Sequence, residues 1–483
     1  MRTLAIRIAA DGAMLCVPDS LDAITTYVLL EQEAWFEKEV PFVRRLMKPG
    51  MTAIDIGANL GTYSIPMARQ VAPTGTVHAY EPASQTRALL TRSAELNGCA
   101  SLIIHAAGLS NRAGEAHLSF GGSSELNALG EGGAGERVAI TSLDLEDAAG
   151  RWPQPVDFIK MDAEGEEERI LEGGQRFFAR HSPLVMFEIK AGDAINHQLS
   201  SRFSAMGYGL YRLLAGAPVL VAHPPGAPID GFELNLFAAR PDRAAKLVAD
   251  GLLATPLPTW AADAAARQQA MTVLNRYPFG AQLVASFGGA SSADAAYRDA
   301  LAAYGCWRDA DNPLDLRCAA LNSAFAGLQT CAAAKPSLAR LSSFARAAWD
   351  AGQRSVCVGA LTQLLDRLMK GAGELDEPFW PAAPRFDVID PGRDKGAWFV
   401  GAAFEQFERA HSFSTFFAPS RIDLRSLCSN PFASAEMERR RILQLARGGQ
   451  HPNVSARLWV PAADHVNADL WRAGRVPGTV ARI

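Results

Sequence analysis

The sequence has 483 residues, of which 48% are hydrophobic and 20% are charged, and its formal net charge is −4. This is the composition of an ordinary globular protein, long enough for two or three domains. The charge provides no global positive field for binding nucleic acid, and no apolar run has the length of a membrane span. Because Arg7 interrupts the first apolar residues too early for a signal peptide, we expect a cytoplasmic protein.

The seven cysteines are scattered along the chain, and no two of them form a CxxC pair. This spacing argues against a zinc site and against a disulfide framework. Several of them lie in helical patterns, where a reduced cysteine behaves as a small apolar core residue.

Residues 1–50 combine a β-like start with a helical pattern. The helix is predicted from about Glu33 to Met47, with Trp35 and Phe36 among its apolar positions, and a Lys-Pro-Gly sequence at 48–50 ends it. We interpret residues 1–50 as a preamble or lid that packs on the next domain.

Strand and helix patterns alternate from residue 51 to about residue 240. The buried strands are predicted at 52–56, 76–80, 102–105, 156–161 and 184–189. Helices between them and short links indicate a parallel, doubly wound sheet. Three further segments are predicted to close it as antiparallel strands, at 208–213, 219–222 and 233–238. A glycine-rich stretch, 121–135, is predicted as a loop inside a hairpin.

The pattern changes after Arg240. Residues 241–260, with the sequence Thr-Pro-Leu-Pro at 255–258, are predicted as a linker, and 261–483 as a mostly α-helical domain of unknown role. Two apolar stripes that meet near Gly352 predict an α-hairpin, similar to one tetratricopeptide-like unit. The aromatic stretch 376–381 is interpreted as a loop anchored on a core, and the three arginines at 439–441 as a solvated helix face.

The first chemical motif follows the strand at 52–56. It carries Asp55, Gly57, Asn59 and Gly61 and leads into a helix. We interpret the two glycines as positions where a Cβ would keep the backbone from a ligand, and Asn59 as a residue that tolerates a positive φ. A strand, a tight turn and a helix N-terminus form the usual place for a nucleotide-like ligand.

Glu81 ends the next strand and narrows the identity of this ligand. A carboxylate there accepts both hydroxyls of a ribose, although a surface glutamate at a strand end is the alternative. The glycine pattern lacks G-x-G-x-x-G, so nothing indicates a pyrophosphate. This favours S-adenosyl-L-methionine over NAD.

Asp162 and Glu164 follow the strand at 156–161 and form the second motif. At this rim of the sheet they are candidates to hold a substrate hydroxyl or to remove its proton; alternatively, Asp162 only caps the next helix. Glu188 ends another strand at the same rim. It is a candidate to orient the substrate, and the alternative is a buried carboxylate with a partner inside the protein. His105 and His181 are alternative bases, although lone histidines are more often structural. No histidine spacing supports a metal, so we predict none.

Several motifs in order resemble the FkbM-type methyltransferase family, over about residues 30–240. They are I-D-I-G-A-N-L-G-T-Y-S (54–64), Y-E-P (80–82), L-N-G (96–98), S-L-D (142–144), D-F-I-K-M-D-A-E-G-E-E (157–167) and M-F-E-I (186–189). The resemblance implies a Rossmann-like methyltransferase sheet, S-adenosyl-L-methionine as the methyl donor and O-methylation, often of a sugar hydroxyl.

The resemblance also implies roles for single residues. Asp162 and Glu164 would face the methyl-transfer centre. Glu81 would take the ribose, and Ala107 would lie near the adenine. The remaining residues of the cofactor set are Asp55, Gly57, Asn59, Gly61, Tyr63 and Pro82. The sequence departs from the family where Met161-Asp162-Ala163 replaces the expected Ile-Asp-Val, and in its helical tail.

We therefore expect an O-methyltransferase that acts on a sugar or glycan-containing substrate, without nucleic acid or a membrane span. The helical domain would contact the substrate or bind a protein partner. The rival hypothesis is a non-catalytic scaffold in a glycan-assembly system, whose helical domain binds another protein.

Overall fold

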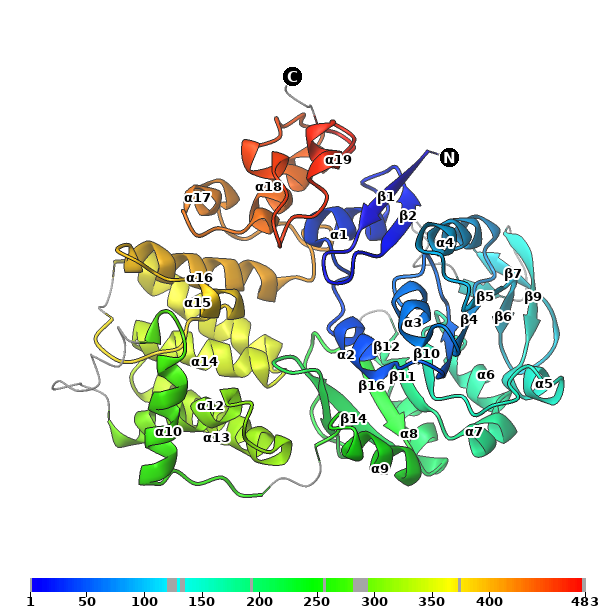
Figure 1. The fold of residues 1–483 in the computed structure, drawn as a ribbon, viewed down its shortest axis with the longest axis horizontal. Helices are drawn as coiled ribbons and strands as arrows, with labels where there is room; N and C mark the ends of the chain where they lie inside the picture. The colour runs from blue at the N-terminus through cyan, green and yellow to red at the C-terminus, as the bar shows by residue number, and fades with distance from the viewer. Residues whose placement is uncertain are drawn as a thin grey trace.

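The computed structural model describes residues 2–119, 128–130, 135–191, 194–254, 258–280, 294–371 and 375–479. An α/β part lies on the right in Figure 1 and a bundle of helices on the left. The N-terminal hairpin and the C-terminal helices lie side by side at the top of the same view. The two ends of the chain thus meet in space.

The α/β part is built on an eight-stranded sheet with the order β15-β14-β16-β11-β10-β3-β4-β5. Five neighbouring strands are parallel: β5 (Leu102–His105), β4 (Thr76–Tyr80), β3 (Thr52–Ile56), β10 (Phe158–Met161) and β11 (Leu184–Glu188). Antiparallel pairs then add β16 (Asn235–Ala239), β14 (Gly209–Leu214) and β15 (Val219–Ala222). The predicted α/β fold class, a doubly wound sheet with antiparallel closing strands, is confirmed.

Helices cover both faces of this sheet, which explains why its central strands are almost wholly buried. On one face α2 (Glu39–Leu46), α3 (Ser64–Val71) and α9 (Pro241–Ala249) share a core with β3 and β10. On the other, α6 (Glu167–Glu172), α7 (Gln175–His181) and α8 (His197–Ala205) pack against β10 and β11. Helices α4 (Ser84–Asn97) and α5 (Leu143–Ala148) complete the part. The predicted linker therefore begins with a packed helix, α9, because Leu247 is buried in the core; residues 255–257 lie outside the described structure.

A smaller sheet stands beside the carboxyl end of β5. It has the order β6-β9-β7-β8, with β6 (Ala107–Leu109), β9 (Glu136–Thr141), β7 (Gly114–Ser119) and β8 (Ala128–Gly130). Strands β7 and β9 pair antiparallel, which confirms the predicted hairpin. Most of the glycine-rich stretch 121–135 lies outside the described residues. Two short strands, β12 (Lys190–Ala191) and β13 (Ala194–Ile195), form a separate pair.

The N-terminal segment contains a hairpin and two helices. They are β1 (Thr3–Arg7), β2 (Met14–Pro18), α1 (Ile24–Gln32) and the helix α2 named above. Strand β2 is joined to α4, since Cys16 N–H donates to Ser93 Oγ at 2.9 Å. The predicted helix from Glu33 to Met47 is wrong in its first half: Glu33 has a φ of 55°, and the chain between α1 and α2 is irregular.

A tertiary contact ends α1 at Glu33. Its carboxylate accepts hydrogen bonds from the backbone N–H groups of Val466, at 2.5 Å, and Asn467, at 3.1 Å. These partners lie more than four hundred positions further along the chain, so the local pattern gives no sign of them.

The helical bundle comprises α10 (Ala264–Asn275), α12 (Ala295–Arg308), α13 (Leu314–Ala334), α14 (Leu338–Asp350), α15 (Arg354–Met369), the short η2 (Pro384–Val388) and α16 (Lys395–His411). Helices α14 and α15 form the predicted α-hairpin, with Gly352 at a φ of 72° in the turn. Phe379 and Trp380 are buried in the same core, as expected for an anchored loop.

The last helices pack against the start of the chain. They are α17 (Leu424–Ser429), α18 (Ala435–Arg447), η3 (Ala456–Trp459) and α19 (Ala468–Arg472). Apolar residues of α18, η3 and α19 share one cluster with β1, β2 and α1. Within the described residues, no helix combines the length and the apolar character needed to cross a membrane.

A buried ionic network joins α18 to α1. Arg439 and Arg440 are each 1% exposed, so the predicted solvated helix face is wrong for both. Arg440 Nε lies 3.2 Å from Glu31 Oε1, and Arg439 Nε donates to the carbonyl oxygen of Glu31 at 2.7 Å. The guanidinium groups of Arg439 and Arg440 face inward because Glu31 and Glu33, at the end of α1, lie beside them. The side chain of Arg441 is more exposed than those of the other two arginines.

Replacing Arg440 with alanine is expected to destabilise the protein by about 3–5 kcal/mol, because Glu31 would be left as an unpaired buried charge. The measurement is urea denaturation followed by circular dichroism. The matched control is Arg472→Ala, whose partner Asp469 is on the surface and whose loss costs at most about 1 kcal/mol. Equal effects of the two substitutions would contradict this role of the network.

Candidate functional site

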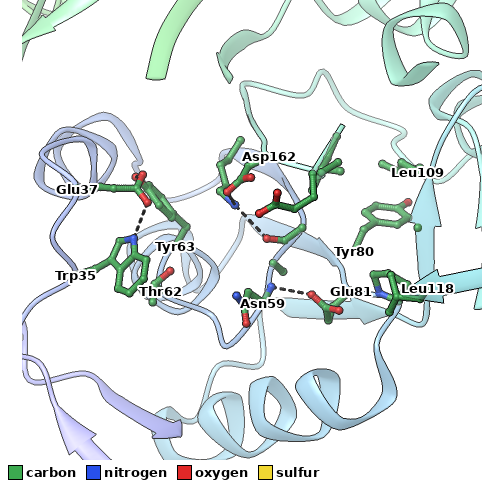
Figure 2. A pocket seen from close by; sticks show the side chains of 18 residues that line it. Trp35, Glu37, Asn59, Thr62, Tyr63, Tyr80, Glu81, Leu109, Leu118 and Asp162 are labelled. Atoms are coloured by element: carbon green, nitrogen blue, oxygen red, sulfur yellow. Dashed lines mark hydrogen bonds and ion pairs between the residues drawn. The ribbon is translucent and has the colours of Figure 1, made fainter. Parts of the chain in front are cut away.

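A pocket opens at the carboxyl ends of β3, β4 and β10. It has a volume of about 840 Å³, part of which is open to solvent. This is the rim at which doubly wound sheets bind ligands. Figure 2 shows the residues that line it and labels several of them. The pocket is lined by Trp35, Glu37, Ile56, Gly57, Ala58, Asn59, Thr62, Tyr63, Tyr80, Glu81, Pro82, Gly108, Leu109, Leu118, Lys160, Asp162, Ala163 and Glu164.

The turn after β3 forms the floor of the pocket. Gly57 has a φ of 71°, and a Cβ there would lie 1.9 Å from the carbonyl oxygen of Asp162. Gly61 has a φ of 93°, and its Cβ would lie 2.7 Å from a methyl group of Leu90. The two glycines are thus required by contacts within the protein, and the interpretation that they also make room for a ligand stays a prediction. Gly61 itself does not line the pocket.

Asn59 and Glu81 form a polar pair in the middle of the pocket (Figure 2). Asn59 has the expected positive φ, 47°. Its backbone N–H donates to Glu81 Oε2 at 2.9 Å, and Ala83 N–H donates to Oε1 at 2.9 Å. Burial raises the pKa of Glu81 to about 7, although these two hydrogen bonds act in the opposite direction. The side-chain oxygen of Asn59 is buried and has no hydrogen-bond partner among the described residues.

Lys160 is the buried cation of the site. Its Nζ lies 3.0 Å from Asp162 Oδ2 and 3.8 Å from Asp55 Oδ1, and it donates to the carbonyl oxygen of Gly57 at 3.0 Å. Burial lowers the pKa of Lys160, but the neighbouring carboxylates raise it by more, so the ammonium stays charged. Asp55 lies beneath the pocket without lining it, and Ser64 Oγ donates to it at 2.5 Å. Asp55 therefore helps to hold Lys160.

Glu37 forms the opposite wall and was missed by the sequence analysis. It accepts hydrogen bonds from Trp35 Nε1 at 2.6 Å, from the hydroxyl group of Tyr63 at 2.6 Å and from Asn235 Nδ2 at 3.0 Å. Burial raises its pKa. Trp35 and Glu37 come from the irregular segment between α1 and α2, which the sequence pattern assigned to a helix. Lys160 was also missed, although a lysine inside a buried strand is a usable signal.

The other end of the pocket is apolar. Figure 2 shows Tyr80, Leu109 and Leu118 gathered there, on the side away from Trp35 and Glu37. Ala107 does not line the pocket, whereas its neighbours Gly108 and Leu109 do. Pro82 lines the pocket, as do Gly57, Asn59, Tyr63 and Glu81 of the predicted cofactor set. The pocket is thus divided into an apolar end and a charged end.

The two carboxylates predicted as catalytic, Asp162 and Glu164, both line the charged end. Glu164 has a φ of 49°, in the left-handed region. Glu188 ends β11 close by: burial first, and then the charges of Asp162 and Glu164, raise its pKa to about 9. A protonated Glu188 is a hydrogen-bond donor at neutral pH.

Neither histidine proposed as a base lines the pocket. His105 Nε2 lies 3.0 Å from His78 Nδ1, and its ring stacks on Tyr80 with centroids 4.4 Å apart. His181 accepts from Val156 N–H, at the amino end of β10, and contacts Asp147. Among the described residues, no group of three or more histidine, cysteine, aspartate or glutamate side chains is placed to hold a metal ion.

Residues 55–209 match the model of the methyltransferase FkbM domain. This segment is an FkbM methyltransferase domain. The predicted resemblance is thus confirmed for the part of the chain that holds the turn, Glu81, Lys160 and the two carboxylates. Trp35 and Glu37 lie before the matched segment, so this wall of the pocket comes from outside it.

Solved structures that match the chain include methyltransferase FkbM from Methylobacillus flagellatus KT, with 16% sequence identity and a TM-score of 0.28. The match covers 42% of this chain and 50% of that chain. The chain thus spans half the length of this first relative. A SAM-dependent O-methyltransferase from Thermotoga maritima shares 16% identity over 49% of this chain and 77% of that chain, with a TM-score of 0.27. Aeropyrum pernix fibrillarin, in complex with natively bound S-adenosyl-L-methionine, has 13% sequence identity with this chain and a TM-score of 0.25. The match covers 50% of this chain and 99% of that chain. No curated protein matches the chain.

The charges of the pocket in the FkbM domain limit its ligand. Four carboxyl groups line it, those of Glu37, Glu81, Asp162 and Glu164, against the single ammonium of Lys160. This ammonium is already paired with two carboxylates. A phosphate group would meet repulsion here, whereas a positively charged ligand would be attracted. The pocket therefore fits a cation with an apolar end and hydroxyl groups.

The Gly57→Ala substitution is expected to prevent normal folding of the site, because the added Cβ meets a backbone oxygen and the positive φ is strained for alanine. Thermal unfolding measured by circular dichroism checks this. The control is Gly359→Ala on α15, where nothing lies within 4 Å of the added Cβ. That substitution should stabilise the helix by about 0.5–1 kcal/mol. A melting temperature for Gly57→Ala equal to that of the wild type would refute the close contact.

Proposed function

We propose that the protein is a cytoplasmic S-adenosyl-L-methionine-dependent O-methyltransferase that methylates a hydroxyl group of a sugar or glycan-containing substrate. The observation that carries the proposal is the composition of the pocket in the FkbM domain. It combines an apolar end, a buried carboxylate in the middle and an excess of carboxyl groups at the far end.

These residues fit the methyl donor in three places. Glu81 keeps lone pairs directed at the pocket after accepting two backbone N–H groups, which suits the two hydroxyls of a ribose. The unpartnered oxygen of Asn59 accepts one more donor. Tyr80, Leu109 and Leu118 suit the adenine. When bound, S-adenosyl-L-methionine supplies an electrophilic methyl group on a positively charged sulfur, and the carboxyl groups at the charged end favour that charge.

The residues at the charged end would act on the acceptor. Asp162 and Glu164 hold the acceptor hydroxyl and take its proton while the oxygen gains the methyl group. Lys160 fixes the position of Asp162 through their 3.0 Å ion pair. Trp35, Tyr63 and Glu37 close the wall beside them and limit the entry of water. Positioning of this kind supplies much of the rate enhancement when the transferred group is already activated.

Titration calorimetry with S-adenosylhomocysteine tests the donor site. The wild type is expected to bind, and Glu81→Ala to lose roughly tenfold or more in affinity, because hydrogen bonds to a charged group contribute about 1.5–3 kcal/mol. The control is Glu95→Ala, since Glu95 lies on the surface of α4 and pairs only with Arg92. Absence of binding, or equal affinity in Glu81→Ala, would refute the proposal.

The same binding should depend on pH through Glu81. Its pKa in the folded protein is about 7, so the carboxyl group is largely protonated at about pH 6 and ionised at about pH 8. The ionised form accepts two hydroxyls, whereas protonation removes one acceptor. Affinity is therefore expected to rise from the lower to the higher pH, and this rise should be smaller in Glu81→Gln.

Transfer of a labelled methyl group to glycans extracted from cells that lack the gene tests the reaction. Asp162→Asn is expected to slow the transfer by about 10²-fold or more, the usual effect of removing an acid–base group, with little change in the affinity for S-adenosylhomocysteine. Glu168→Gln, next to the site on α6, should keep the wild-type rate. Binding of the donor without any transfer to glycans would favour the scaffold hypothesis.

A further inference from the structure

A second cavity lies where the α/β part meets the helical bundle, and we call it the junction cavity. It has a volume of about 570 Å³, part of which is open to solvent. Its lining residues are Phe36, Glu37, Lys38, Glu39, Ala215, Asp230, Phe232, Glu233, Leu234, Trp349, Gly352, Arg354 and Phe413. Glu37 also lines the pocket of the FkbM domain, so one residue separates the two spaces.

Three distant parts of the chain build the junction cavity. Residues 36–39 lead into α2, whose first residue is Glu39, and residues 230–234 precede β16. Trp349 and Arg354 belong to the helical bundle, and Phe413 follows it directly. All lining residues lie outside 55–209, the segment that matches the FkbM model. The junction cavity is therefore formed by residues outside the FkbM segment, and it adjoins the pocket of the FkbM domain at Glu37.

Flat aromatic surfaces form much of its wall. The ring of Phe413 lies 5.1 Å from that of Phe36 and 5.8 Å from that of Phe232, centroid to centroid. The guanidinium group of Arg354 lies 4.2 Å from the Phe413 ring and 5.6 Å from that of Trp349. Such surfaces suit a ring-shaped ligand with an apolar face.

The cations of the junction cavity are already engaged. Arg354 donates to the carbonyl oxygens of Ala410, at 2.8 Å, and Arg409, at 2.9 Å. Lys38 Nζ lies 2.6 Å from Glu233 Oε1. Neither cation has its charge directed at an empty space, so neither provides a ready partner for a phosphate or a carboxylate.

A carboxyl group, in contrast, is unused. Glu39 is 2% exposed, and its Oε1 has no hydrogen-bond partner among the described residues. Burial, which outweighs the attraction of Lys38, raises the pKa of Glu39 to about 8. An unsatisfied buried polar atom destabilises a protein, and a hydroxyl group of a ligand would satisfy it. Glu37 and Asp230 add to the acidic character of the wall.

We propose that the junction cavity binds the acceptor of the methyl group, and that the part held there is an uncharged ring bearing hydroxyl groups, not a phosphorylated or carboxylated one. The inference rests on the proposed methyl transfer. It places one part of the acceptor in the junction cavity, and the hydroxyl group to be methylated reaches past Glu37 to Asp162 and Glu164. The helical bundle then acts in the reaction by completing the acceptor site through Trp349, Arg354 and Phe413.

Saturation-transfer NMR tests this with two sets of probes and S-adenosylhomocysteine present. One set is glucose, galactose, mannose and rhamnose; the other is the 6-phosphates of the first three. At least one neutral sugar is expected to bind the wild type, and the phosphates to bind at least about threefold more weakly than their parent sugars. In Trp349→Ala the affinity should fall about three- to tenfold, the contribution of one aromatic surface.

Trp459→Ala is the matched control, because Trp459 is another half-buried tryptophan but packs on the cluster of the N-terminal hairpin. It should leave sugar binding unchanged. Phe232→Ala is a second variant of the wall, on a loop, and provides the same test if Trp349→Ala does not fold. Absence of binding by every neutral sugar, equal binding of the phosphates, or unchanged binding in both wall variants would overturn the inference.

Calorimetry with S-adenosylhomocysteine on the same samples separates this inference from the proposed function. If the donor product binds to the wild type and to Trp349→Ala alike while no neutral sugar binds, the inference fails and the methyl-donor site stands. If the donor product does not bind to the wild type, the proposed function itself fails.

Discussion

The structure depends on a buried electrostatic joint between the two ends of the chain. Glu31 and Glu33, at the end of α1, are 0% exposed, and they take their partners from residues 414–415, 439–440 and 465–467. Buried carboxylates without partners are strongly unfavourable, so α1 is stable only with these contacts. Because Trp35 and Glu37 follow within a few residues, the joint also fixes the wall of the pocket in the FkbM domain.

The segment from Trp35 to Glu39 connects this joint to both cavities. Trp35 and Glu37 face the first pocket, Phe36 and Glu39 face the junction cavity, and Glu37 belongs to both. One short stretch of consecutive residues thus lines both spaces. The helical bundle holds the stretch from the far side, where the ring of Phe36 packs against Phe413 and Phe417. This side of the molecule is therefore connected to the pocket in the FkbM domain by direct contacts.

The predicted site residues that the structure brings together in one pocket follow local rules. The turn after β3 and the carboxylates at the ends of β4 and β10 lie where a parallel sheet brings strand ends together. A second requirement for Gly57, the carbonyl oxygen of Asp162, left no sign in the sequence, because this neighbour follows a different strand. Trp35 and Glu37 were missed because a partner 433 positions away interrupts a plausible helix. The burial of Arg439 and Arg440 was missed for the same reason. Their carboxylate partners are distant in the sequence, so the run of arginines itself gives no sign of them.

The joint between the chain ends also governs the order in which the protein is made. A ribosome releases the FkbM segment long before residues 439–440 and 465–467, so during synthesis α1 ends in two carboxylates with no counter-charge. Domains generally fold from the N-terminus as they emerge, but here the segment that carries Trp35 and Glu37 lacks its support until residues 439–440 and 465–467 have been made. The nascent protein thus carries a nearly complete sheet before one wall of its pocket is held in place.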